Sequence, residues 1–251
     1  MGEPARPDAG ASKSGGWLSG WKLAVLAAAI GALVGAAVMA ASSGFFVRRY
    51  LIANPEVLPD AMNVLQEREA QEKQRALAPA VARNRAALET PFHGAWAGAA
   101  RPDVVLVEFF DYACGYCRAS NPHIDRLLRE DPRLRVVWRE FPVLGPDSEQ
   151  AAAASLAAAR AGRYRAFYDT LFGAGRPTAA AVARARQAAG LGETALDDEA
   201  RRELERNFAL AREIQAEGTP TFVVGDQVLH GAVGYDALRE AIAAARASRA
   251  G

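Results

Sequence analysis

The sequence has no excess of either charge. Its 251 residues carry 30 Lys and Arg and 29 Asp and Glu, which leaves a formal net charge of +1. Proteins that bind nucleic acid or an acidic substrate usually concentrate basic side chains on one surface, and the scattered balance here offers no such surface. No nucleic-acid partner is expected.

Metal-binding side chains are scarce as well. The chain has two cysteines and three histidines, His93, His123 and His230, without the paired histidine spacing of a zinc site. Because a closed zinc site usually takes four such ligands, a structural metal is disfavoured. The histidines are interpreted as surface or packing residues, and no metal or other cofactor is expected.

One stretch lacks charge altogether. Leu23 to Val47 is an uncharged run of 25 residues, which as a helix would be about 37 Å long against a bilayer core of about 30 Å. Aromatic residues flank both ends, as in the interfacial belts of membrane proteins: Trp17, Trp21, Phe45, Phe46 and Tyr50. The run predicts a transmembrane signal-anchor helix over residues 23–47.

The charges around this helix indicate its orientation. Three basic residues precede it, and Arg48 and Arg49 follow it, so the positive-inside rule slightly favours a cytoplasmic N-terminus. Residues 1–22 are then a cytoplasmic tail, disordered over its Gly-, Pro- and Ser-rich start. A cleaved signal peptide is the alternative, because Val38-Met39-Ala40 is an acceptable cleavage site.

The segment of residues 48–90 is charged and helical in composition. Between Asn54 and Leu88 its apolar residues form two short stripes, and Pro79 is expected to kink or split the helix. The stripes are too small to bury the segment alone, so it packs on the following domain, packs on another copy or serves as a spacer. A homo-oligomer formed through residues 54–88 and a plain spacer both remain open.

Residues 91–251 have the pattern of a single α/β domain. Apolar runs predict buried strands at Val104–Phe110 and Leu134–Val143. The helical stretch Arg118–Glu130 between them completes a βαβ unit, whose two strands should be parallel.

Helices are expected to fill the next part of the domain, about residues 147–216, as an insertion. Asp147 and Gln150 resemble a capping box at the start of the first helix, which should end near Ala161. Further helices are expected at Arg163–Phe172, Thr178–Ala189 and Glu193–Ala216. The dipeptide Gly225-Asp226 then predicts a β-hairpin, and a final helix closes the chain. The strands of this hairpin are Thr221–Val224 and Gln227–His230.

Both cysteines lie in one stretch, Cys114-Gly115-Tyr116-Cys117, between a predicted strand and a predicted helix. Side chains three apart on a helix face the same way, so the two thiols can form a disulfide. Cys114 falls at the helix N-terminus, where free N–H groups and the helix dipole favour a thiolate. The spacing predicts a redox pair with Cys114 as the nucleophile and Cys117 as the resolving thiol.

Two other interpretations of the pair are open at this point. A structural disulfide across four residues removes only about 2 kcal/mol of unfolded-chain entropy, less than a longer loop would. Two thiolates can also hold copper(I), a soft ion. Against copper, Met1, Met39 and Met62 all lie outside the domain and supply no thioether cluster.

Two motifs carry a family resemblance. The stretch VEFFDYACGYC, with Pro122 five residues after its second cysteine, and the segment Gly218–Phe222 near the C-terminus resemble the thiol:disulfide oxidoreductases of the DsbA family. Within that family the chain looks closest to the ScsC-like, disulfide isomerase-like branch. The resemblance covers about Val104 to the C-terminus and implies a thioredoxin-like fold with a helical insertion and a cis-proline loop beside the cysteines.

The resemblance also implies roles for individual residues. Glu108 matches a buried acid that relays a proton to or from the resolving thiol, which is plausible chemistry because burial raises the pKa of a carboxyl toward neutral pH. Strand alternation puts Glu108 on the face of Phe110, so a solvent-facing glutamate is the alternative. Pro220 is expected in the cis form, with Thr219 presenting backbone groups to an extended substrate segment; a trans turn proline is the alternative.

The dipeptide Gly115-Tyr116 is placed with the substrate-binding residues. It differs from the Pro-His pair of strongly oxidising family members. Together with Thr219, it looks more like the dipeptide of disulfide isomerases and reductases, which puts a pure oxidase role in doubt.

The reaction implied is thiol–disulfide exchange on exported proteins, with the Cys114–Cys117 disulfide in place of a cofactor. An isomerase or oxidase is expected; a reductase of periplasmic disulfides and a copper(I)-binding thiol protein are the alternatives. A redox partner must recycle the cysteines. Because such chemistry needs an oxidising compartment, the catalytic domain should lie in the periplasm, anchored by one pass through the inner (cytoplasmic) membrane or soluble after signal cleavage.

Overall fold

The structure is a computed structural model that describes residues 17–192 and 197–250. The predicted disordered start of the tail, residues 1–16, and the first residues of the helix predicted at Glu193–Ala216 lie outside these ranges. The chain divides into two units between Glu67 and Arg68, and each unit is described by itself.

The first unit contains one long apolar helix. Helix α1 runs from Trp17 to Ala53 and is longer at both ends than the predicted 23–47. Its stretch Trp21–Ala53 has a mean hydropathy of 2.4 over its most apolar window, and none of that window is buried against the rest of the protein. By length and composition this helix can cross a membrane.

Helix α2 extends from Val57 to Glu89. Pro79 lies inside it and does not split it, contrary to one of the two predicted outcomes. The physical reason is that Pro79 is exposed, so the carbonyl that loses its N–H partner can bond water instead. The second predicted apolar stripe is buried: Leu77, Val81 and Leu88 pack on the sheet of the second unit.

The second unit is built on a five-stranded sheet with the order β1-β3-β2-β4-β5. The central pair β2 and β3 is parallel, as the βαβ pattern predicts, and the other neighbours are antiparallel. Strand β3 ends before Pro142, which has no N–H group for the ladder. The strands are β1 Trp96–Gly98, β2 Val104–Phe110, β3 Leu134–Glu140, β4 Thr221–Val224 and β5 Gln227–His230.

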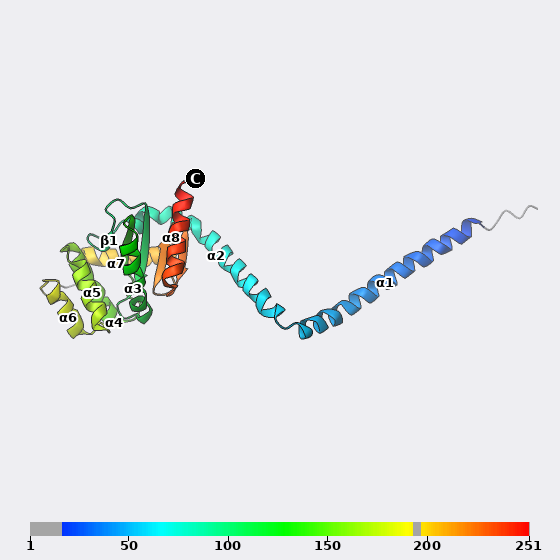
Figure 1. The fold of residues 1–251 in the computed structure, drawn as a ribbon, viewed down its shortest axis with the longest axis horizontal. Coiled ribbons are helices and arrows are strands. Elements are labelled where there is room, and N and C mark those ends of the chain that lie inside the picture. The colour runs from blue at the N-terminus through cyan, green and yellow to red at the C-terminus, as the bar shows by residue number, and fades with distance from the viewer. Residues whose placement is uncertain (1–16, 193–196, 251) are drawn as a thin grey trace, which may run out of the picture. The chain divides into compact units, whose positions relative to one another are not determined.

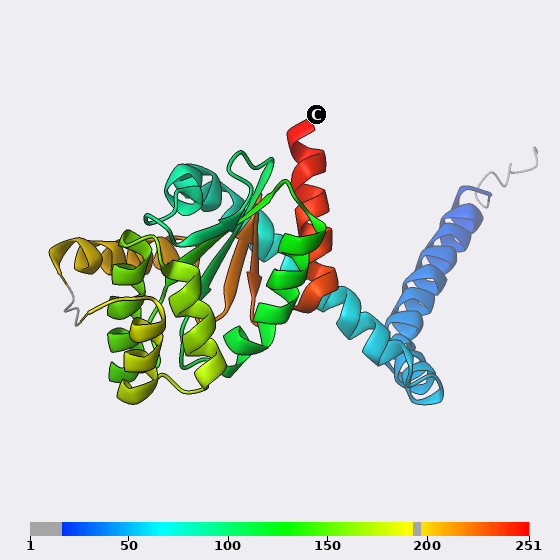
Figure 2. The ribbon, with the colours of Figure 1, turned by 60° about the vertical axis from the view of Figure 1, so that its left-hand side comes forward.

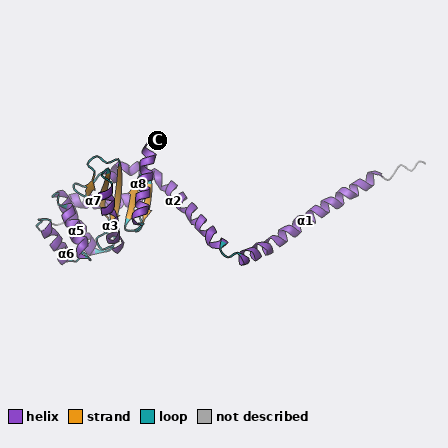
Figure 3. Cartoon of the chain, viewed as in Figure 1, coloured by secondary structure: helices purple, strands orange, loops and turns teal. Residues whose placement is uncertain are grey.

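Helices cover both faces of this sheet (Figures 1, 2 and 3). Helices α3 to α6 and α8 pack on one face, and α2 and α7 pack on the other. The fold is thioredoxin-like, with the helical insertion between β3 and β4, as predicted. The helices are α3 Gly115–Glu130, α4 Pro146–Arg160, α5 Tyr164–Ala174, α6 Ala179–Ala188, α7 Asp198–Glu213 and α8 Gly234–Ala250.

Two details of the local predictions turn out differently. Asp147 does not cap α4, because the cap residue is Gly145 with Pro146 at the first helical position, so Asp147 already lies in the first turn. The three-residue strand β1 was not predicted, since so short a segment has no readable periodicity. The hairpin at Gly225-Asp226 is confirmed, and Gly225 has φ +60°, a value that favours glycine.

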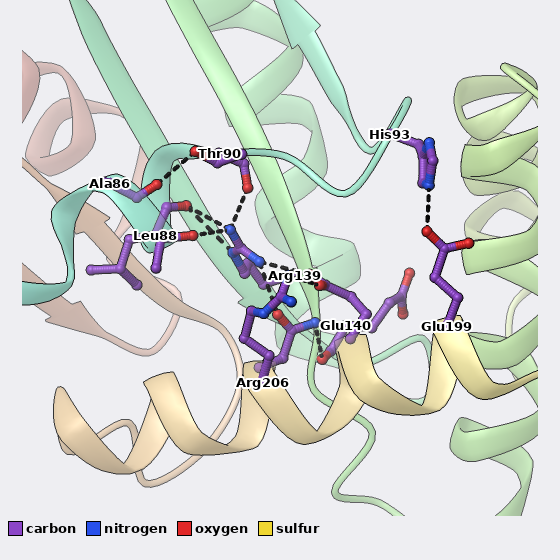
Figure 4. A network of polar contacts seen from close by, with 11 residues as sticks. Ala86, Leu88, Thr90, His93, Arg139, Glu140, Glu199 and Arg206 are labelled. Atoms are coloured by element: carbon purple, nitrogen blue, oxygen red, sulfur yellow. Dashed lines mark hydrogen bonds and ion pairs between the residues drawn. The ribbon is translucent and has the colours of Figure 1, made fainter.

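A buried arginine fixes the end of β3 on the α2/α7 face (Figure 4). Arg139 is only 2% exposed, and its guanidinium donates to Glu203 at 2.7 Å and to Asn207 at 3.0 Å. It also donates to the carbonyls of Ala87, Leu88 and Thr90, at and just beyond the end of α2. These carbonyls would otherwise lack partners, so one side chain ties α2, β3 and α7 together.

The outer edge of β5 is also occupied. The Gln74 side-chain amide donates to the carbonyl of Val228, and the Val228 N–H donates back to Gln74 Oε1 at 3.0 Å. Arg85 donates to the Gly225 carbonyl at 3.1 Å and pairs with Asp226. Helix α2 is therefore held to the β4–β5 hairpin by polar contacts as well as by its apolar stripe.

Candidate active site

Cys114 occupies the N-cap position of α3, where β2 and its following turn deliver it. Its backbone is extended, with φ −78° and ψ 118°, and its sulfur accepts the backbone N–H of Cys117 at 3.4 Å. The side chain is 6% exposed, and both cysteines are free. The helix N-terminus that the cysteine spacing predicts is thus where the sulfur lies.

The surroundings of Cys114 favour its thiolate. The main cause is hydrogen bonding by the Cys117 thiol. The Thr219 side chain and the backbone N–H groups of Cys117 and Tyr116 also stabilise the thiolate, and together they lower the pKa of Cys114 to about 5 although burial opposes the shift. At neutral pH the sulfur is therefore a ready nucleophile.

Cys117 is held in the opposite protonation state. It lies one turn into α3 and is fully buried. Burial, the hydrogen bond to Cys114 and the nearby charge of Glu108 all raise the pKa of Cys117 well above its ordinary value. Any step in which Cys117 acts as a nucleophile consequently needs a base to take its proton.

The Gly218–Phe222 segment lies directly beside Cys114. The peptide bond between Thr219 and Pro220 is cis, and the Cys114 sulfur lies 3.2 Å from the Thr219 carbonyl oxygen. Pro220 is buried, and its carbonyl accepts the Gly231 N–H at 2.8 Å. The structure thus brings Thr219 and Pro220 to the nucleophile; their role toward a substrate stays a prediction.

The dipeptide between the cysteines faces outward. Tyr116 is 71% exposed, and a side chain added at Gly115 would meet no atom within 4 Å. Val143 and Leu144, in the loop that follows β3, are also exposed apolar residues. Tyr116 and the position of Gly115 are therefore accessible to a macromolecular substrate.

Glu108 is completely buried on β2, on the same face of the sheet as the cysteines. The solvent-facing alternative is therefore wrong, because helices cover this face and Phe110 beside it is buried as well. Neither carboxyl oxygen has a hydrogen-bond partner among the described residues. Burial raises the pKa of Glu108 to about 8, which suits a carboxyl that exchanges protons near neutral pH.

Sequence reasoning missed two residues that shape the site. The carboxylate of Asp111 accepts the N–H of Ala113 at 2.8 Å and those of Val143 and Leu144 at 2.9 and 3.0 Å. It thereby fixes the cysteine turn to the loop after β3. Arg118 donates to the Phe172 carbonyl at 3.2 Å and so ties α3 to α5. The sequence signal for Asp111 was its position three residues before the cysteine that caps the helix.

No group of three or more His, Cys, Asp and Glu side chains converges on a possible metal site in residues 17–192 and 197–250. Of the histidines, His93 pairs with Glu199 at 3.0 Å, far along the chain from the cysteines.

Comparison with known families agrees with this geometry. The DSBA-like thioredoxin domain family matches residues 105–243, more than half of the chain. The chain belongs to this family. Residues 44–72 match a second description, the copper resistance protein ScsC N-terminal domain. The predicted resemblance is confirmed, and the domain is a thioredoxin-fold thiol:disulfide oxidoreductase domain.

Solved structures are similar over most of the chain. A Proteus mirabilis ScsC structure in a transitional conformation is 30% identical, covers 81% of this chain and 93% of its own, and has a TM-score of 0.63. A periplasmic thioredoxin-like protein from Salmonella enterica serovar Typhimurium is 29% identical, covers 65% of this chain and 95% of its own, and has a TM-score of 0.61.

The curated relatives that match this chain are much longer than it is. The Na(+)/H(+) antiporter NhaA 3 of Salinispora tropica is 32% identical over 155 residues, which are 58% of this chain and 24% of the antiporter. The chain thus spans about a quarter of the length of the curated relatives it matches.

Proposed function

We propose that this protein exchanges disulfides in exported proteins, as an isomerase or oxidase, through Cys114 and Cys117. The observation that carries the proposal is the pairing of opposite thiol states: a Cys114 with a lowered pKa at a helix N-terminus and a fully buried Cys117 with a raised pKa one turn later. A structural disulfide would need neither an activated sulfur nor a buried acid beside its partner.

The exchange begins when the Cys114 thiolate attacks a client disulfide. One client sulfur leaves as a thiolate, and the other forms a mixed disulfide with Cys114. In isomerisation a second client thiolate attacks the mixed disulfide, which frees Cys114 again. In resolution Cys117 gives its proton to Glu108, bonds to Cys114 and releases the reduced client.

Oxidation of a client is the reverse of resolution. A client thiolate attacks the Cys114–Cys117 disulfide at Cys114, and Cys117 departs with the electron pair and takes a proton from Glu108. A second client thiol then displaces Cys114. Each oxidised client leaves the pair reduced, so a redox partner must return it to the disulfide.

The proposed location is the periplasmic side of the inner membrane. Helix α1 is apolar enough to span a bilayer, and the similar Salmonella protein is described as periplasmic. An oxidising compartment suits the reaction. Alkaline extraction of membranes should leave the chain in the pellet, and protease should reach the domain only in spheroplasts; release of a shortened soluble chain would favour a cleaved signal peptide.

A homo-oligomer through residues 54–88 is a second part of the proposal, restricted to the N-terminal half of that segment. Leu58, Met62 and Leu65 are exposed in α2, whereas Leu77 and Val81 are already buried on the domain. Light scattering of the full chain in detergent should report more than one copy per particle, and charge substitutions at Leu58 and Met62 should reduce it to one.

The direct test uses the full chain in detergent. Equilibration with glutathione buffers should give a reduction potential above about −220 mV, and a small protein with scrambled disulfides should regain its native pairs. A potential below about −300 mV would instead favour the reductase alternative. Cys114→Ala is the control, and a Cys114→Ala variant that exchanged disulfides at the wild-type rate would exclude the proposal.

A further inference from the structure

A second buried acid lies on the active-site face. Glu140 ends β3, and the register of the parallel strands pairs Phe110 with Glu140 and Glu108 with Trp138. Glu108 and Glu140 are thus diagonal neighbours on one face of the sheet, and long side chains can meet across such a diagonal. Glu140 is 2% exposed.

Several polar atoms at this place have no partner. Within the described residues, no well-formed hydrogen bond reaches either oxygen of Glu108, Oε1 of Glu140 or the indole Nε1 of Trp138. The Trp138 indole is nevertheless close enough to Glu108 to oppose the rise in the pKa of that carboxyl. Buried polar atoms are nearly always paired, and an unpaired one costs stability. These unpaired atoms include both donors and acceptors: an ionised Glu108 could accept hydrogen bonds from the Trp138 N–H and from a protonated Glu140.

The groups facing Glu140 disfavour its charged form. Glu108 faces it from β2, Asp111 and Tyr112 from the following turn, Ser155 from α4 and Tyr164 from α5, and no cation is among them. Burial raises the pKa of Glu140, and the charges of Asp111 and Glu108 raise it further. A protonated carboxyl is a hydrogen-bond donor.

The Glu140 carboxyl is not needed to hold the strand. Asn207 donates to the Glu140 backbone carbonyl at 3.1 Å, and the Phe141 N–H donates to Phe110 at 2.8 Å. The neighbouring Arg139 fixes the strand from the opposite face (Figure 4). Beyond a contact with Ser155 of α4, the acidic side chain adds a buried carboxyl with an unpaired oxygen, which is typical of a group kept for chemistry.

We propose that Glu140 and Trp138 are positioning residues that donate hydrogen bonds to the Glu108 carboxylate while Cys117 gains or loses its proton. The inference rests on the proposed function. In resolution the S–H bond of Cys117 breaks, the proton goes to Glu108, the Cys117–Cys114 bond forms, and the client sulfur leaves with the electron pair of the mixed disulfide. Before this step, and after its reverse, Glu108 carries a charge that the two donors stabilise.

The test is the pH dependence of resolution in the full chain, measured by stopped flow with a disulfide-bonded peptide as the client. Glu140→Leu should move the midpoint of the Glu108-dependent limb upward by about one pH unit, and Trp138→Phe by about half as much, since each removes one donor to the charged form. Glu140→Gln keeps a donor of the same shape and should stay within about 0.3 units of wild type. An unshifted midpoint in Glu140→Leu, or an equal shift in Glu140→Gln, overturns the inference.

A second readout separates this inference from the proposed function. Infrared spectra of the reduced full chain should show two buried protonated carboxyls at neutral pH, one lost in Glu108→Gln and the other in Glu140→Gln. The Glu108 band should titrate at higher pH in Glu140→Leu than in wild type. If wild type exchanges no disulfides but these bands behave as stated, the proposed function fails alone; if exchange is normal and the bands do not move, the inference fails alone.

Discussion

The two faces of the sheet treat buried charge in opposite ways. Two adjacent residues of β3 show the difference. Arg139 points to the α2/α7 face, and each nitrogen of its guanidinium donates a hydrogen bond. Glu140 lies on the cysteine face, and its Oε1 has no partner among the described residues. Both are 2% exposed. The Arg139 network holds helices α2 and α7 to the strand, whereas Glu108 and Glu140 lie on the same face as the two cysteines.

The difference indicates which face is built for stability and which for reaction. A fully paired buried charge holds one arrangement of its neighbours, and removing one partner leaves the other uncompensated. An unpaired buried acid lowers stability but changes protonation near neutral pH, as a proton relay must. Substitutions on the two faces should therefore have opposite effects on stability.

The largest effect is expected on the paired face. Arg139→Met leaves one oxygen of the buried Glu203 carboxylate and the helix-end carbonyls without a donor, so it should lower the free energy of unfolding by about 3–5 kcal/mol in urea titrations of the full chain in detergent. Arg206, which is exposed and bonds the other Glu203 oxygen at 2.9 Å, gives the control: Arg206→Gln should cost less than about 1 kcal/mol. Equal losses from both variants would contradict the contrast.

On the cysteine face, Glu108→Gln should stabilise the reduced protein while slowing resolution. The unfolded carboxyl ionises near 4.5 and the folded one near 8, so the unfolded state releases its proton first and wild-type stability falls as pH rises between these values. The variant lacks this loss and should be more stable by about 2–4 kcal/mol at pH 8. At pH 4 the two should be equal; a less stable variant at pH 8 would show that Glu108 has a structural partner.

A smaller effect should arise at the cis-proline loop. Thr219→Val removes one of the hydrogen bonds that favour the Cys114 thiolate, and should raise the pKa of Cys114 from about 5 by about one unit. The ultraviolet absorbance of the thiolate measures this titration, with Cys114→Ser as the blank. Thr219→Ser keeps the hydroxyl and should titrate as wild type does; a shift as large as that of Thr219→Val would assign the effect to loop packing.

The smallest effect is expected between the cysteines. Because Tyr116 is 71% exposed, Tyr116→Ala should change the free energy of unfolding by no more than about 0.5 kcal/mol and leave the Cys114 titration unchanged. Glutathione exchange should be unaffected, whereas turnover of a protein client should fall if the ring contacts it. A loss above about 1.5 kcal/mol would mean that Tyr116 packs on the domain.

The sequence predicted the features that local chemistry decides. The run Val104–Phe110 is buried along its whole length, and Gly225-Asp226 makes the hairpin, because a strand between two layers must be apolar and a two-residue turn needs positive φ. Cys114 caps helix α3 and Cys117 lies one turn later, as their three-residue spacing between a strand and a helix predicts. Family resemblance then supplied Glu108.

The rest depends on register and on distant partners. Whether Glu140 lies beside Glu108 is decided by how β2 and β3 align, and a one-residue slip would reverse every side chain. Arg139 and Glu203 form their ion pair although 64 positions separate them in the sequence, and no local sequence pattern predicts such a contact. Pro79 shows that a local rule can also fail. Proline usually breaks a helix, but α2 continues through Pro79 because the carbonyl that loses its N–H partner can bond water.

The side-chain amide of Gln74 makes the two hydrogen bonds to Val228 that the backbone of a sixth strand beside β5 would make. Free edges of sheets readily recruit extended peptides, and unfolded polypeptides are rich in unpaired backbone groups. With the donor and acceptor of Val228 both taken by a single side chain from α2, another chain cannot pair with β5 at this residue. An extended client segment must therefore pair elsewhere on the domain, which lowers the risk of aggregation at this edge.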